Sequence, residues 1–233
     1  MELFTEHNDE TPMAAAGYFL NTANQNLPGL PDVSKIFELS ADAYYATIYA
    51  VMSEMPIKAE IARFIEKTAN AADREAAVRA AFDRGDPDVH MVLRAAYKVQ
   101  HEIHRLTGLL RFSPNHDGVY VARCAPDHFI IPALADHFYL RFGETPWAII
   151  DEKRKLCLYR ESGGEVQLAS LAPGSVCDLS APQLQTEGKE KADSWEDLWR
   201  LYHRSVNNEG KKNLRLQRQL MPERYHKYLN ELQ

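Results

Sequence analysis

The sequence predicts an α+β protein: an N-terminal helical subdomain, then a small, mostly antiparallel sheet with packed helices, and a helical C-terminus. Two patterns lead to this prediction. Apolar residues recur at helical spacing through most of the first hundred residues, and five short β-like runs then follow, interrupted by one helix. The chain has 233 residues, 45% of them hydrophobic and 26% charged, which suits one large globular domain or two small ones.

Three regions follow from these patterns. We expect residues 1–35, which are rich in Asn, Pro, Gly and Thr, to be a loosely ordered lead-in where only Met13–Leu20 looks helical. Residues 36–107 form the helical subdomain. Residues 108–233 form the α+β region with basic C-terminal helices. We expect the last two regions to fold as one continuous domain from residue 36.

Four amphipathic helices are expected in the helical subdomain. They cover Ser40–Met55, Ile57–Thr68, Asp73–Asp83 and Asp88–Gly108. Ser40 suits an N-cap and Pro56 stops the first helix, because proline lacks the backbone donor that a helix interior needs. Pro87 sits just inside the start of the fourth helix, and Gly108 is placed to end it.

Five strands are expected after these helices. They cover Leu109–Phe112, Val119–Ala125, Trp147–Ile150, Leu156–Tyr159 and Val166–Leu171. The first two form a hairpin around a cluster of turn residues that ends in Asp117-Gly118. A helix that begins after Asp127 and ends at Gly143 interrupts the strands, with Pro132 tolerable only in its first turn. We expect helices packed against one face of a largely antiparallel sheet.

The C-terminal part begins with a predicted loop at residues 172–193. Ser194 then opens a capping box, and an apolar stripe marks the next helix: Trp195, Leu198, Trp199 and Tyr202. Arg200 and Arg204 occupy a different face. Aromatic residues beside arginines suit stacking on nucleic-acid bases, but a stripe at helical spacing is more often core, and core is the interpretation we favour.

Composition excludes several classes of protein. No stretch approaches the roughly 20 apolar residues of a membrane helix, and the acidic start MELFTEHNDE lacks the order of a secretory signal, so we expect a cytoplasmic protein. The three cysteines, Cys124, Cys157 and Cys177, lie far apart without C-x-x-C spacing. This pattern indicates reduced, partly buried thiols, and neither a disulfide framework nor a zinc or iron–sulfur site.

Charge is distributed unevenly along an acidic chain of net charge −6. Residues 1–90 carry 15 acidic and 7 basic residues, whereas Trp199–Tyr228 carries eight Lys and Arg against two Glu. A basic end on an acidic protein can contact phosphates while the rest of the molecule repels them. A solvated helix face produces the same pattern.

Histidines gather in the middle of the chain, around two Asp-His pairs nine residues apart. His101 and His104 share one helical face, as two metal ligands would, but the motif is H-E-x-H and spacing specifies no third ligand. Hydrogen-bonded structural histidines are therefore expected, and no metal site. Asp127, His128 and His104 could form an acid/base set if the fold brings them together, since histidine titrates near neutrality.

Three stretches resemble a bacterial family of DNA-metabolism or DNA-repair proteins of unknown activity. They are HEIHRLTGLLRF, DGVYVARCAPDHFIIPALADHFYLRFGETPWAIID, and WRLYHRSV followed by NLRLQRQLMPERYHKYLNEL. The resemblance is dense over roughly residues 90–230 and looser over 36–90. Such proteins commonly open with a strand and a Tyr-Asp-Gly turn, which MELFTEHNDE does not supply, so we expect a divergent or shortened N-terminus.

The resemblance implies a role in DNA repair beside a radical S-adenosylmethionine protein, and some family members are fused to a uracil-DNA-glycosylase-type domain. It implies no reaction. The chain has no C-x-x-x-C-x-x-C motif, no G-x-G-x-x-G after a strand and no Walker loop, so we expect neither an iron–sulfur cluster nor a nucleotide bound by those means. No G-x-S-x-G elbow indicates a nucleophile.

Three hypotheses remain open from the sequence. The first is a DNA-repair accessory protein that contacts phosphates through Arg204, Lys211, Lys212, Arg215, Arg218 and Arg224 and docks the radical enzyme. The second is a stand-alone nuclease or glycosylase-like enzyme that uses the central His and Asp residues. The third is a protein-interaction module whose basic end recognises an acidic partner.

Overall fold

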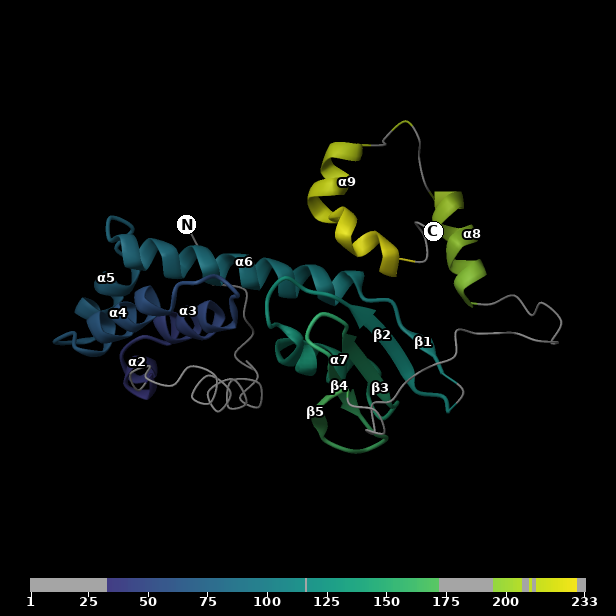
Figure 1. Ribbon diagram of the computed structural model, residues 1–233, viewed down its shortest axis with the longest axis horizontal. Coiled ribbons are helices and arrows are strands. Elements are labelled where there is room, and N and C mark those ends of the chain that lie inside the picture. Colours follow the sequence, from purple (N-terminus) through teal and green to yellow (C-terminus); the bar gives the residue numbers. More distant parts are fainter. Residues whose placement is uncertain (1–32, 116, 172–194, 207–209, 211–212, 230–233) are drawn as a thin grey trace. The chain divides into compact units, whose positions relative to one another are not determined.

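The computed structural model describes residues 33–115, 117–171, 195–206, 210 and 213–229 (Figure 1). The chain forms two compact units. The first contains the residues up to His104 together with Asp127–Asp136, and the second contains Arg105–Pro126 and the residues from His137 onward. Residues 1–32 of the expected lead-in, with the Met13–Leu20 helix, and the predicted loop 172–193 lie outside the described residues, whereas Ser34 and Lys35 at the end of the lead-in are helical.

The first unit is helical and the second contains a five-stranded sheet, so the fold class is the predicted α+β (Figure 1). The helices that begin in the first unit are α2 (Ser34–Leu39), α3 (Ala41–Met52), α4 (Lys58–Ala69), α5 (Arg74–Phe82), α6 (Pro87–Leu109), η1 (Ile131–Leu134) and α7 (Ala135–Phe142). No helix in the described part of the chain combines the length and the apolar character that crossing a membrane requires.

Local hydrogen bonds explain where α3 begins and ends and where α5 begins. Ser40 Oγ accepts the Ala43 N–H at 3.3 Å and caps α3, as predicted, and Asp73 caps α5 in the same way. Helix α3 ends at Met52, three residues earlier than expected. The Ser53 backbone is extended and its hydroxyl accepts the Met55 N–H at 3.2 Å, so the turn begins before Pro56. Helix α2 was not predicted from the sequence.

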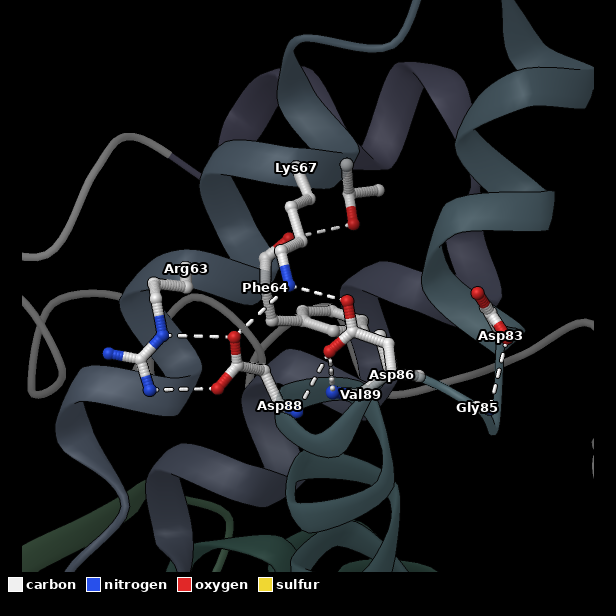
Figure 2. Close-up of polar contacts among 9 residues, drawn as sticks. Arg63, Phe64, Lys67, Asp83, Gly85, Asp86, Asp88 and Val89 are labelled. Atoms are coloured by element: carbon white, nitrogen blue, oxygen red, sulfur yellow. Dashed lines mark hydrogen bonds and ion pairs between the residues drawn. The ribbon is translucent and has the colours of Figure 1, made fainter.

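An ionic cluster joins α4 to the start of α6 (Figure 2). Arg63 donates to both carboxylate oxygens of Asp88, from Nε at 2.9 Å and from Nη2 at 2.7 Å, and Lys67 donates to Asp86 and Asp88. Asp86 also caps α6, because its Oδ1 accepts the backbone N–H of Asp88 at 2.8 Å. Hydrogen bonds from Arg63 and Lys67 lower the pKa of the Asp88 carboxyl to about 2.

The sheet of the second unit has the strand order β1-β2-β3-β4-β5. Its strands are β1 (Ser113–Pro114), β2 (Tyr120–Cys124), β3 (Trp147–Asp151), β4 (Leu156–Arg160) and β5 (Val166–Ser170). Three of the four pairings are antiparallel, and only β2 and β3 run parallel, connected by η1 and α7. The predicted largely antiparallel sheet is thus confirmed.

Two element predictions need correction. The run Leu109–Phe112 was expected to be the first strand, but α6 extends through Gly108 to Leu109, and the Leu110 N–H still donates to the Leu106 carbonyl at 3.1 Å. Only the two residues of β1 pair with β2. The expected helix up to Gly143 is divided, because η1, which contains Pro132, is a 3₁₀ turn that precedes α7.

The core of the second unit lies on both faces of the sheet. All five residues of β3 are buried. On one face, Trp147 packs with Phe138 of α7, whose ring centroid lies 6.2 Å away. On the other face, Ala148 and Ile150 pack with Cys157. Cys124 and Cys157 are buried thiols, in line with the prediction, and Cys177 lies outside the described residues.

Candidate functional site

In the first unit, a buried carboxylate holds the central Asp-His segment. Glu102 on α6 is 2% exposed, and its two oxygens accept the backbone N–H groups of Asp127 at 2.7 Å and His128 at 2.8 Å. A buried carboxylate needs such donors, and each hydrogen bond to a charged group contributes about 1.5–3 kcal/mol. Glu102 therefore fixes the chain that enters η1.

The same segment is also bonded to the end of α3. His128 Nδ1 accepts the backbone N–H of Glu54 at 3.3 Å, and the Phe129 N–H donates to the Met52 carbonyl at 3.0 Å. An accepting Nδ1 assigns the proton of the neutral ring to Nε2. Because its lone pair is engaged, Nδ1 cannot act as a base while this bond is made. The contacts of His128 are those of a structural residue.

The acid/base set expected from the sequence lies in this unit: His104, Asp127 and His128. His104 and Asp127 are exposed and His128 is half-buried. In the described part of the chain, no group of three or more His, Cys, Asp or Glu residues could hold a metal ion. The catalytic role of the three residues stays a prediction.

Glu102 was not predicted from the sequence as a residue that holds the Asp-His segment. A signal for it was present. Glu102 lies three residues after Val99 and four before Leu106, and both neighbours are buried. It therefore occupies the apolar face of α6, where the helical period calls for a hydrophobic residue. An acid at such a position needs partners, because burial of an unpaired charge is strongly unfavourable.

In the second unit, η3 (Glu223–Tyr228) anchors the C-terminal segment beside the sheet. Tyr225 and Leu229 are buried. The Tyr228 hydroxyl donates to Glu152 Oε2 at 2.7 Å, and Lys227 Nζ lies 3.3 Å from the same oxygen. Glu152 directly follows β3. Two hydrogen bonds to the Glu152 carboxylate therefore join η3 to the β3–β4 turn, and Tyr225 and Leu229 add buried side chains to the segment.

The anchor shifts the pKa of both partners. Burial, together with donation to Glu152, raises the pKa of the Tyr228 hydroxyl. Burial alone would raise the pKa of Glu152 as well, but donation from Tyr228 and Lys227 outweighs it and lowers that pKa. The charge of Arg123, 3.8 Å away, acts in the same direction. Glu152 therefore remains an ionised acceptor at neutral pH.

Two more helices precede η3: α8 (Trp195–Val206) and α9 (Leu214–Leu220). The predicted phosphate-contacting residues belong to this segment. Lys211 and Lys212 lie outside the described residues. The other four are exposed: Arg204, Arg215, Arg218 and Arg224. Within the described ranges, Arg204 and Arg215 have neither an ion-pair nor a hydrogen-bond partner, so their charges are available to a ligand.

The remaining two arginines have partners in the chain. Arg218 Nε lies 3.2 Å from Glu223 Oε1, and both side chains are well exposed, so this pair contributes at most about 1 kcal/mol. The Arg224 guanidinium lies over the Tyr225 ring, 4.7 Å from its centroid, and donates to the Tyr225 hydroxyl at 3.2 Å. A bound phosphate would compete with Glu223 for Arg218.

The described apolar side chains of α8 and α9 are also exposed. They are Leu198, Leu201, Tyr202, Val206, Leu214, Leu216 and Leu220. The stripe of α8 was interpreted as core, but Leu198 is 43% and Tyr202 55% exposed, so that interpretation is wrong for these two residues. The side chains of Trp195 and Trp199 lie outside the described part of the chain. Tyr225, which lies in η3 and not in that stripe, is 1% exposed. Within α9 no side chain is buried.

A family model for a domain of unknown function, DUF4130, matches residues 57–231, well over half of the chain. The chain belongs to the DUF4130 family. The DUF4130 match includes both the Glu102 segment and the arginines of α8 and α9. The comparisons with curated proteins and with solved structures found no match. The expectation of a family without an assigned activity is confirmed, and the DNA-repair role stays a prediction.

Proposed function

We propose that this DUF4130 protein is an accessory protein of DNA metabolism or repair that contacts nucleic acid through α8, α9 and η3. The observation that carries this proposal is the exposure of Arg204 and Arg215, which have no partner in the described part of the chain. Guanidinium groups match phosphate geometry. The resemblance noted in the sequence supports the repair role and a radical S-adenosylmethionine enzyme as the catalytic partner.

A second function, docking of a protein partner, is favoured by the apolar face of α8. Leu198, Leu201 and Val206 are all exposed, and Leu198 and Leu201 lie one helical turn apart. Phosphate cannot cover such a face, whereas a groove on another protein can. We assign this face to the radical enzyme. The arginines then contact DNA while the leucines contact the partner.

The first test is a titration of the pure protein with a short duplex and a single strand at low salt. We expect measurable binding to both that weakens as salt rises, because contacts to phosphate release counterions. Fluorescence anisotropy at several salt concentrations gives the affinity and its salt slope. A flat titration with both DNAs at about 50 mM salt would remove DNA binding and leave protein docking as the function of these helices.

Reversing the charge of two arginines tests whether the C-terminal helices form the DNA-binding surface. Arg215→Glu with Arg218→Glu should weaken binding to DNA of any sequence by at least about tenfold and lower the salt slope by about 0.7 for each lost contact on single strands. The matched control, Lys35→Glu with Arg79→Glu, makes the same change in net charge in the first unit. Equal effects of the two double variants would show that net charge alone governs binding.

A further inference from the structure

A pocket in the first unit takes no part in the proposed function. It lies between α6 and the end of α5 and has a volume of about 290 Å³. Phe82 and Arg84 form its wall on the α5 side. The residues on the α6 side are His90, Leu93, Arg94, Tyr97 and Gln100. All of these residues belong to one compact unit.

The α6 side of the pocket is a single helical stripe. His90, the adjacent pair Leu93 and Arg94, Tyr97 and Gln100 come from successive turns, three or four positions from one turn to the next, so their side chains leave the helix on the same side. Tyr97 is 51% exposed, and the His101 ring contacts it edge-on with centroids 4.3 Å apart. This contact supports the ring from one side. The stripe therefore presents an aromatic surface beside polar groups.

The cations of the pocket are unneutralised. In the described part of the chain, neither Arg84 nor Arg94 has an ion-pair or hydrogen-bond partner, and no Asp or Glu lines the pocket. This differs from the neighbouring cluster of Arg63 and Lys67, where aspartates take up the positive charge (Figure 2). Two guanidinium groups beside apolar walls favour an anion that also carries an apolar or aromatic part.

We propose that this pocket binds one nucleotide, with its base stacked on Tyr97 and its phosphate held by Arg84 and Arg94. Ligand pockets usually measure about 300 to 1,000 Å³, so this one suits a ligand of mononucleotide size. Inorganic phosphate would leave Phe82 and Leu93 uncovered, whereas a base can use both. The chain has no Walker or G-x-G-x-x-G loop, so arginines replace the backbone donors that those loops provide.

Calorimetric titration of the full chain with dAMP tests this proposal. We expect dAMP to bind, and both deoxyadenosine and inorganic phosphate to bind at least about tenfold more weakly, because each uses one half of the pocket. The ligand has two sources, a free nucleotide or one nucleotide of a single strand. Displacement of dAMP by a short oligodeoxyadenylate supports the strand, and its failure to displace dAMP supports the free nucleotide.

Single substitutions test whether dAMP binds in this pocket. Tyr97→Ala and Arg94→Ala should each weaken dAMP binding at least about fivefold, whereas Lys98→Ala, which removes a charge from the same helix outside the pocket, should change it less than about twofold. All three positions are exposed, so folding is retained and a thermal melt verifies it.

Three results would overturn the proposal: no dAMP binding at millimolar concentration, binding unchanged by Tyr97→Ala, or phosphate bound as tightly as dAMP. The proposal is independent of the proposed function. Reversal of Arg215 and Arg218 leaves dAMP binding unchanged if the pocket is the site. Loss of dAMP binding in that double variant would instead place the nucleotide on the C-terminal helices.

Discussion

The first unit and the C-terminal helices use charged residues in opposite ways. In the first unit, Glu102 is buried and accepts two backbone N–H groups, and Asp88 lies between Arg63 and Lys67. On α8 and α9, the leucines and three arginines, Arg204, Arg215 and Arg218, are exposed. The backbone N–H groups of Asp127 and His128 donate to Glu102. By contrast, the described part of the chain supplies no partner for Arg204 or Arg215.

This difference separates structural charge from charge that is available for binding. The central histidines are the more suggestive feature of the sequence, yet Glu102 and the Nδ1 atom of His128 are engaged by backbone donors. The C-terminal arginines are the less specific feature, since any solvated helix has charges. Unneutralised charge beside exposed apolar surface is nevertheless what an interface with a ligand or a partner requires.

The largest expected effect follows from the removal of the buried acceptor. Glu102→Ala leaves the N–H groups of Asp127 and His128 without their acceptor, so we expect the free energy of unfolding to fall by about 2–5 kcal/mol. Urea denaturation followed by circular dichroism measures it. Glu75→Ala, which breaks an exposed pair with Arg79, should cost less than about 1 kcal/mol. A loss below about 1 kcal/mol for Glu102→Ala would mean that this segment is not held by the carboxylate.

A smaller effect is expected from the exposed ionic cluster, and it depends on pH. The folded pKa of Asp88 is about 2, below its ordinary value, so the cluster stabilises the protein above about pH 4 and this contribution is lost as pH falls towards 2. Asp88→Asn should therefore lower stability at neutral pH and flatten the decline between pH 4 and 2. Urea midpoints at pH 5 and pH 3 measure both effects.

The matched control for this pH dependence is Glu161→Gln, an exposed acid in the second unit. It should keep the wild-type profile. If Asp88→Asn declines between pH 4 and 2 as steeply as the wild type, then the cluster in Figure 2 does not control acid stability. The decline would then have to come from other carboxyl groups.

Periodicity and capping residues were sufficient to predict most helices, because Ser40 and Asp73 signal starts that local hydrogen bonds then fix. The strand at Leu109–Phe112 was wrong for a physical reason. A short apolar run fits the end of a buried helix as well as a strand, and only packing decides between them. The two residues of β1 carry no strand signal at all, since Ser113 and Pro114 pair only because β2 lies beside them.

The candidate sites depended even more on tertiary contacts. The salt bridge of Arg218 with Glu223 joins residues five apart, which are not neighbours on one helix, and it forms because α9 ends at Leu220 and the chain turns. The pocket beside Tyr97 needs α5 and α6 together. From the sequence alone, Arg84 and Arg94 were two charges among many, and their lack of acidic neighbours could not be inferred.

The smallest expected effect concerns single-strand preference. Of the tyrosines among the C-terminal arginines, Tyr225 is buried and Tyr228 donates to Glu152, which leaves Tyr202 as the exposed tyrosine on the described surface of this segment. Tyr202→Ala should reduce the ratio of single-strand to duplex affinity about fivefold, since stacking depends on the ring. Anisotropy titrations with both DNAs measure the ratio, and Tyr202→Phe, which keeps the ring, should preserve it. An unchanged ratio in Tyr202→Ala would mean that the C-terminal helices bind phosphate alone.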